Sequence, residues 1–287
     1  MYWFEDLQYP LMTGIAVGTL CSLLSVIVVL KRMAFIGQGI SHAGFGGIGT
    51  AIFLGLSGLH QDLAVLGFCI LTALVIGKLT RRQKIEPDSA IAILLVAAMA
   101  WGVLIDEARA ALLQGNVEWY VKMFGFDAGR STFEQLLFGS ILSVTFERTI
   151  LAVVLATLVL AICVALFKEL LFFAFDEEVS RVFGVSNRLM HYLMLVLLAI
   201  TIVISIRLAG FVLVSALLVI PGATALQLSR RLPVVFLWAW IVGTVGLMGG
   251  LLLSYFVLDE FSTGPCIVSV LCVMFGVVYG GRALTGA

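Results

Sequence analysis

Residues 11–30 read LMTGIAVGTLCSLLSVIVVL, and none of these twenty side chains is charged. An α-helix rises 1.5 Å per residue, so a run of roughly 20 apolar residues is long enough to cross the hydrocarbon core of a bilayer. The run follows the opening MYWFEDLQYP, which is acidic and aromatic and lacks the basic region of a cleaved secretory signal. We therefore expect a retained transmembrane helix at this position.

Apolar runs of this kind recur along the whole chain of 287 residues. Hydrophobic residues make up 62% of the sequence and charged residues 12%, which leaves too little polar material to cover a water-soluble globule. We predict an all-α, polytopic transmembrane helical bundle with about eight to nine spanning helices, in a single domain that covers residues 1–287. The expected spans are 11–30, 41–57, 62–79, 88–105, 149–172, 190–208, 211–228, 234–257 and 265–281. The second is glycine-rich and the seventh contains a proline, so eight spans with one broken element are the alternative.

The lysines and arginines indicate how the bundle is oriented. If the connection after the first span is cytoplasmic, alternation of the spans places 12 of the 17 basic residues on that side. Cytoplasmic connections carry the excess of Lys and Arg, so we expect an exterior N-terminus and a cytoplasmic C-terminus. The residues on the cytoplasmic side are Lys31, Arg32, Lys78, Arg81, Arg82, Lys84, Lys168, Arg181, Arg188, Arg230, Arg231 and Arg282.

The longest polar stretch is the exterior connection at about 106–148. Its aromatic cluster around Trp119 and Tyr120 indicates short helices that lie at the level of the lipid headgroups. A surface loop and a docking surface for a partner protein are the two interpretations of this stretch.

The cytoplasmic connection at about 176–186 reads DEEVSRVFGVS and has the pattern of a short amphipathic helix. Its first turn is acidic, apolar residues follow at helical spacing, and a glycine stands where the helix would end. Such a helix suits a groove on a partner protein, with a position on the lipid surface as the alternative. The residues concerned are Asp176, Glu177, Glu178, Val179, Val182, Phe183, Gly184 and Val185.

His42 is the clearest ionisable residue at membrane depth, where such residues are costly and often functional. Gln38 lies four residues earlier and so on the same helical face, with Ser41 beside it. An imidazole nitrogen binds zinc, manganese or iron, and an amide oxygen completes a weak site from which a metal can leave. The alternative is a histidine that is hydrogen-bonded within the structure. The glycines around it indicate close helix packing, or a broken helix that lines a pathway.

A second polar cluster lies in the run LAGFVLVSALLVIPGATA, which starts at Leu208. Pro221 removes a backbone hydrogen bond and is expected to kink the helix. Ser215 and Thr224 are candidates either to satisfy the freed carbonyls or, with Ser41, to line a pathway.

Two absences narrow the function. The sequence holds no GxxxxGK[ST] motif, so the chain does not bind ATP in the P-loop manner, and any ATP-driven motor is another polypeptide. The five cysteines show no CxxC or Cys/His spacing and are interpreted as packing residues.

Five stretches together resemble one known family. KRMAFIGQGISHAGFGG, LLFGSILSVTFE, DEEVSRVFGV, LAGFVLVSALLVIPGATA and TGPCIV occur in this order, and the chain resembles the metal-ion permeases of ABC importers for zinc, manganese and iron. The resemblance implies a multi-pass protein of the cell (inner) membrane that is not an enzyme. It also implies a dimeric pore formed with a second copy or a paralogue, cytoplasmic ATPase subunits that bind ATP, and an extracytoplasmic metal-binding protein. The segment from Asp176 to Val185 would be the coupling helix that meets the ATPase.

The resemblance also bears on the metal site. In the family, an aspartate usually stands four residues before the histidine, and the pair is a waypoint for the metal; here the position holds Gln38, while His42 is kept. The missing negative charge weakens attraction for a dication and leaves the identity of the metal open. An ABC permease for a metal chelate or another small solute, and a secondary transporter that works without ATP, remain the alternatives.

Overall fold

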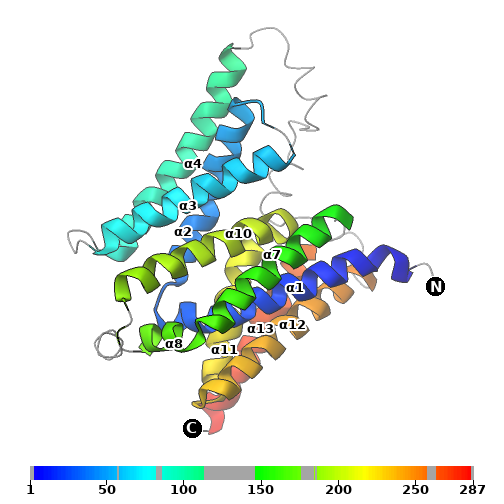
Figure 1. The fold of residues 1–287 in the computed structure, drawn as a ribbon. Coiled ribbons are helices and arrows are strands. Elements are labelled where there is room, and N and C mark those ends of the chain that lie inside the picture. Colours follow the sequence, from blue (N-terminus) through cyan, green and yellow to red (C-terminus); the bar gives the residue numbers. More distant parts are fainter. Residues whose placement is uncertain are drawn as a thin grey trace.

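The computed structural model describes residues 3–56, 58–81, 86–112, 146–175, 184, 186–256 and 263–285. Within these ranges the chain forms ten α-helices and no strand, so the predicted all-α class is confirmed (Figure 1). The helices are α1 Trp3–Leu30, α2 Ala34–Phe53, α3 Leu59–Arg81, α4 Pro87–Leu112, α7 Phe146–Ala165, α8 Phe167–Phe175, α10 Asn187–Leu217, α11 Ile220–Leu228, α12 Leu232–Phe256 and α13 Thr263–Thr285.

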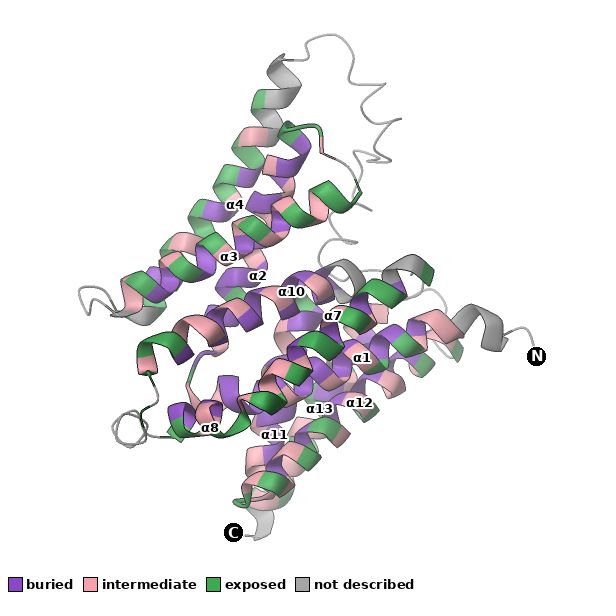
Figure 2. Cartoon of the chain, in the orientation of Figure 1, coloured by how far each residue is buried: buried purple, intermediate pink, exposed green. Residues whose placement is uncertain are grey.

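The helices confirm a multi-pass membrane protein. Among the described residues, seven segments are long and apolar enough to cross a bilayer, or eight if the bent pair α7–α8 counts as one span. The twenty-residue helix α2 is not among the seven, because its glycines and polar residues lower its hydropathy. Exposed apolar side chains cover the outward faces of α4, α7, α12 and α13, as expected for surfaces in contact with lipid (Figure 2).

Breaks in the observed helices bear on three of the expected spans. The span expected at 149–172 is broken at Leu166, where α7 and α8 are bent by 69°. The spans expected at 190–208 and 211–228 meet within α10, where Gly210 has φ 74° and ψ 167° and interrupts the helix. Only glycine adopts such a backbone conformation without strain, so the predicted division into two spans is confirmed.

The break near Pro221 lies earlier in the chain than expected. The helix ends at Leu217, Leu218 and Val219 form a turn, and Pro221 lies in the first turn of α11. A proline in this position loses no helical hydrogen bond, because the first N–H groups of a helix have no partner within it. The proline therefore begins a new helix instead of kinking an existing one.

The helices alternate in direction, and the N- and C-termini lie toward opposite ends of the bundle (Figure 1). The exposed basic residues Arg32, Lys78, Lys168, Arg188 and Arg231 lie at or near helix ends that gather at the end of the bundle where the C-terminus lies. This is the alternation on which the sequence-based orientation depends.

The helix α2 packs tightly against α3 and α4 through its glycines. A Cβ atom on Gly49 would lie 2.6 Å from the carbonyl oxygen of Gly102, and one on Gly47 would lie 2.9 Å from Cα of Val65. Backbones approach this closely only where side chains are absent, so the interpretation of the glycines as packing residues is confirmed. One face of α2 is consequently fixed against its neighbours.

We expect Gly49→Ala to destabilise the protein, because its methyl group would meet backbone atoms of α4 that have no room to move. Overpacking of this type costs about 1–3 kcal/mol of unfolding free energy. The measurement is thermal unfolding of the detergent-solubilised protein. The matched control is Gly67→Ala on α3, where a Cβ meets nothing within 4 Å, and this variant should unfold at or slightly above the wild-type temperature. Equal unfolding temperatures for the two variants would contradict the packing.

Candidate functional site

The exposed face of α2 carries its polar pair. Phe35 and Gln38 are exposed and His42 and Phe45 are half-buried, at spacings of three and four residues that align them on one side of the helix. The glycine face of the same helix packs against α3 and α4. The predicted neighbours Gln38 and His42 therefore share one side of α2, on which Gln38 is exposed and His42 is half-buried.

The ring of His42 lies against two aromatic rings. Its centroid is 6.2 Å from that of Phe45 and 6.2 Å from that of Phe211, with interplanar angles of 15° and 5°. Phe45 and Phe211 stack on each other with centroids 4.2 Å apart. Two elements far apart in the sequence, α2 and the second segment of α10, thus hold the imidazole plane in one orientation.

The Nδ1 atom of His42 is buried and makes no hydrogen bond to any residue that the structure describes. A buried nitrogen without a hydrogen-bond partner lowers the folding stability by about 1–3 kcal/mol, so such atoms are rare in proteins and often have a functional role. Neutral imidazole has one nitrogen that accepts, and this nitrogen is the one that binds metal ions. The alternative interpretation, a histidine held by hydrogen bonds within the structure, has no support at Nδ1.

Local backbone features place Phe211 beside His42. Gly210 breaks the helix directly before it, and a Cβ on Gly44 would come within 3.0 Å of the Phe211 ring. Phe211 is 1% exposed. The sequence analysis did not predict Phe45 or Phe211 as site residues. The only signal for Phe45 was its spacing of three residues from His42, and the only signal for Phe211 was its position directly after Gly210.

The hydroxyl groups predicted as pathway candidates are bonded within their own helices. Ser41 donates to the carbonyl of Gly37 at 2.8 Å, Ser215 to that of Phe211 at 3.0 Å, and Thr224 to that of Ile220 at 2.7 Å. Each hydroxyl oxygen keeps its lone pairs for a further contact.

The structure groups some of these residues and separates others. Ser215 lies one turn beyond Phe211 and so belongs to the region of His42. Thr224 and Pro221 are buried in α11, which packs chiefly against α1, α12 and α13.

One chain supplies only part of a metal site. No group of three or more His, Cys, Asp or Glu side chains lies together in the described part of the chain. His42 and Gln38 offer two ligands at most, whereas zinc in proteins is usually bound by four. A complete site at this position needs ligands from outside the described chain.

The predicted cytoplasmic helix lies largely outside the described residues, as does the exterior stretch 113–145. The residues concerned are Asp176, Glu177, Glu178, Val179, Val182, Phe183 and Val185. Gly184 is described and has φ 78°, the conformation that a helix-ending glycine takes.

The helix α8 precedes this segment and touches the turn that leads into α2. Phe173 is 1% exposed, and the Nζ atom of Lys31 lies 3.9 Å from the centroid of its ring. A lysine over an aromatic face is attracted by the negative charge density of the ring. Lys31 belongs to the short turn between α1 and α2, where Arg32 has φ 55°. The end of α8 is therefore in contact with the start of the helix that carries His42.

These features define a membrane permease. The chain is a bundle of spanning helices that includes the glycine-packed helix α2 with its polar side, and no soluble catalytic unit is among its described elements. It belongs to the ABC 3 transport family, whose sequence model matches residues 3–279. The resemblance inferred from the five motifs is confirmed, and the chain is a transport subunit and not an enzyme.

Individual relatives agree over nearly the whole chain. It is 31% identical over 277 residues to the manganese transport system membrane protein MntC of Halalkalibacterium halodurans, covering 96% of this chain and 87% of that protein. It is also 31% identical to the "Probable iron transport system membrane protein" of Haemophilus influenzae, covering 95% and 92% of the two chains. The solved structure of PsaBC from Streptococcus pneumoniae in complex with Fab is similar with a TM-score of 0.78 and 25% identity, covering 96% and 91%.

We expect Phe211→Ala to lower the unfolding free energy by about 3–5 kcal/mol, the usual cost of removing a buried phenylalanine. The ring is fully buried and supports both Phe45 and His42. Chemical denaturation of the purified protein in detergent measures the difference. Val212→Ala is the control, because this neighbour is 38% exposed and should change stability by less than about 1 kcal/mol. Similar values for the two variants would show that Phe211 does not support the site.

Proposed function

We propose that this chain is the membrane-spanning subunit of an ATP-driven importer for a divalent transition-metal ion such as zinc, manganese or iron. The observation that carries the proposal is the buried Nδ1 of His42, which makes no hydrogen bond to the described residues, on the same side of α2 as the exposed Gln38. The names of two relatives, which refer to manganese and iron, support the same class of cargo.

The ligand chemistry suits a waypoint more than a storage site. Imidazole binds all three metals, and the amide oxygen of Gln38 adds a neutral ligand. A dication bound without a carboxylate is held weakly and leaves readily, which transport requires. A second permease protomer, a copy or a paralogue, would present the same pair across a shared axis and bring the ligands to four.

Transport would proceed by alternating access. An extracytoplasmic binding protein delivers the ion at the exterior end, where the connection 106–148 is the candidate docking region. ATPase subunits act on the segment 176–185, which follows α8 in the chain; the exposed basic residues near the described helix ends assign that side to the cytoplasm of a cell (inner) membrane by the positive-inside rule. Their movement shifts α8, and the shift reaches α2 through the contact between Phe173 and Lys31.

The neutral side chain of Gln38 suggests a second candidate for the cargo. A neutral residue at this position also suits a metal chelate or another cargo with less positive charge, carried by an ABC permease of the same architecture. Uptake assays with free Mn²⁺ and Zn²⁺ separate this candidate from the importer of free ions.

We expect His42→Ala to reduce metal uptake by at least about tenfold, the loss that about 1.4 kcal/mol of binding free energy produces. The measurement is uptake of radiolabelled Mn²⁺ and Zn²⁺ into proteoliposomes that contain the chain, its ATPase and its binding protein. A second variant, Gln38→Asp, restores a negative charge and is expected to bind both ions more tightly.

The matched control for His42→Ala is Thr157→Ala, which changes an exposed residue of α7. The hydroxyl of Thr157 donates to the carbonyl of Val153 in the same helix, so its loss should leave uptake close to the wild-type rate. Unchanged uptake in His42→Ala would remove the proposed waypoint. No uptake of either ion by the wild-type complex would overturn the proposed cargo.

We expect Lys31→Met to lower the number of metal ions moved per ATP hydrolysed, because it removes the charge that holds the α1–α2 turn against Phe173. The expected fall is several-fold, the scale set by a cation–π contact of about 1 kcal/mol. ATP hydrolysis and ion uptake are measured on the same proteoliposomes. Lys78→Met, an exposed lysine on α3, is the control and should keep the wild-type ratio. A wild-type ratio in Lys31→Met would exclude this contact from coupling.

A further inference from the structure

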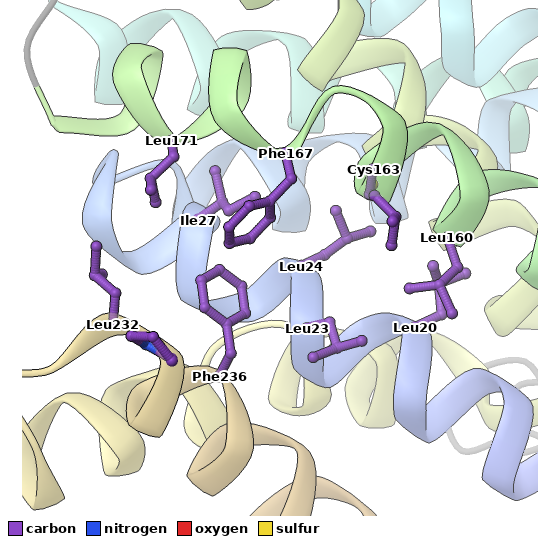
Figure 3. Close-up of a pocket in the computed structure, with 12 residues that line it drawn as sticks. Leu20, Leu23, Leu24, Ile27, Leu160, Cys163, Phe167, Leu171, Leu232 and Phe236 are labelled. Carbon is purple, nitrogen blue, oxygen red and sulfur yellow. The ribbon is translucent and has the colours of Figure 1, made fainter.

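An apolar pocket of about 410 Å³ lies between α1, the α7–α8 bend and α12 (Figure 3). Its walls include Leu24 of α1, Cys163 of α7, Phe167 of α8 and Phe236 of α12. No polar atom lines it. A cavity of this composition holds apolar groups and does not hold water.

The pocket exists because α7 and α8 are not collinear. The 69° bend at Leu166 turns α8 away from the direction of α7, and Phe167 begins the new helix. The ring of Phe167 lies across the pocket from that of Phe236, with centroids 5.3 Å apart and planes at 64° (Figure 3). The two rings narrow the pocket between α8 and α12.

The pocket is separate from the site on α2. Its walls are α1, α7, α8 and α12, whereas α2 packs against α3, α4 and α10. Val164 lines the pocket and is 66% exposed, and Leu158 of α7 and Leu237 of α12 are exposed as well, which indicates that these helices meet lipid. The pocket is thus a feature of the lipid-facing surface and does not depend on the identity of the cargo.

Cations flank one end of the pocket. Lys168 directly follows Phe167, and Arg230 and Arg231 directly precede the wall residue Leu232. All three cations are exposed, and consecutive Cα atoms are only about 3.8 Å apart, so each cation is attached to the backbone within two residues of a wall residue and has a side chain long enough to extend toward the rim. The carboxylate of Glu169, which is half-buried, is one opposing charge in this region. The local balance favours an anion.

We propose that the pocket binds one acyl chain of an anionic phospholipid, whose phosphate group lies against Arg230, Arg231 and Lys168. The cations stand at the basic end of the bundle, and the cytoplasmic leaflet is the one that carries anionic headgroups. An apolar slot beside a cationic rim matches the two halves of such a molecule. The acyl chain of a zwitterionic lipid fits the pocket equally well, but its headgroup is attracted less strongly by the three cations.

The test uses the full-length protein purified in detergent, incubated with phosphatidylglycerol or phosphatidylcholine of identical acyl chains, and analysed by native mass spectrometry. The wild-type protein should retain phosphatidylglycerol in preference to phosphatidylcholine. The double variant Arg230→Gln/Arg231→Gln should lose roughly tenfold or more of this preference, the scale expected when two cations leave an anionic surface. Cys163→Trp fills the slot and should reduce retention of both lipids.

Two controls match these changes. Val245→Trp adds the same bulk at an exposed position of α12 outside the pocket, and Lys78→Gln removes a cation on α3; both should bind lipid like the wild type. Wild-type lipid retention in Cys163→Trp, or equal retention of the two lipids by the wild-type protein, would overturn the proposal. A change from dimer to monomer mass in Cys163→Trp would also overturn it, by assigning the pocket to contact with a second copy.

Discussion

The close approach of α2 to α4 is the contact on which the rest of the structure depends. Gly49 faces Gly102 with no side chain between the two backbones, and Gly46 approaches the carbonyl of Ala98 in the same way. Because water is absent from the bilayer core, the hydrophobic effect does not drive helices together there. Close van der Waals packing stabilises their association instead. One face of α2 is used for this packing, so the polar pair Gln38 and His42 is left on the other face.

Two breaks in long helices have different consequences. At Gly210 the chain reverses between two spans and brings Phe211 against His42, which orients the imidazole. At Leu166 the chain bends by 69° and opens the apolar pocket beside α8. At Leu166 the backbone stays hydrogen-bonded, since its N–H donates to the carbonyl of Ile162 and its carbonyl accepts from the N–H of Leu170, as the bilayer requires. Irregular positions in this bundle are therefore the places where ligands are proposed to bind.

The proposed coupling and the proposed waypoint are connected by a short physical route. Phe173 on α8 contacts Lys31 in the turn before α2, and Gln38 and His42 follow within the next three turns of that helix. A packed helix moves as a rigid body, so a displacement at the turn is transmitted along α2. The cation–π contact of Lys31 with Phe173 joins the two elements at the start of this route.

The sequence by itself determined the all-α membrane class, the family, most of the spans and the shared face of Gln38 and His42. These features depend on hydropathy and on helical periodicity, which are local along the chain. It did not reveal the bend at Leu166, the start of α11 at Pro221, or the two rings beside His42. Only the tertiary structure decided them, because Phe211 is 169 residues from His42 and the two meet only when α2 and α10 pack together. Hydropathy predicts that a residue is buried away from water, whereas its contact partners are determined by how the helices pack together.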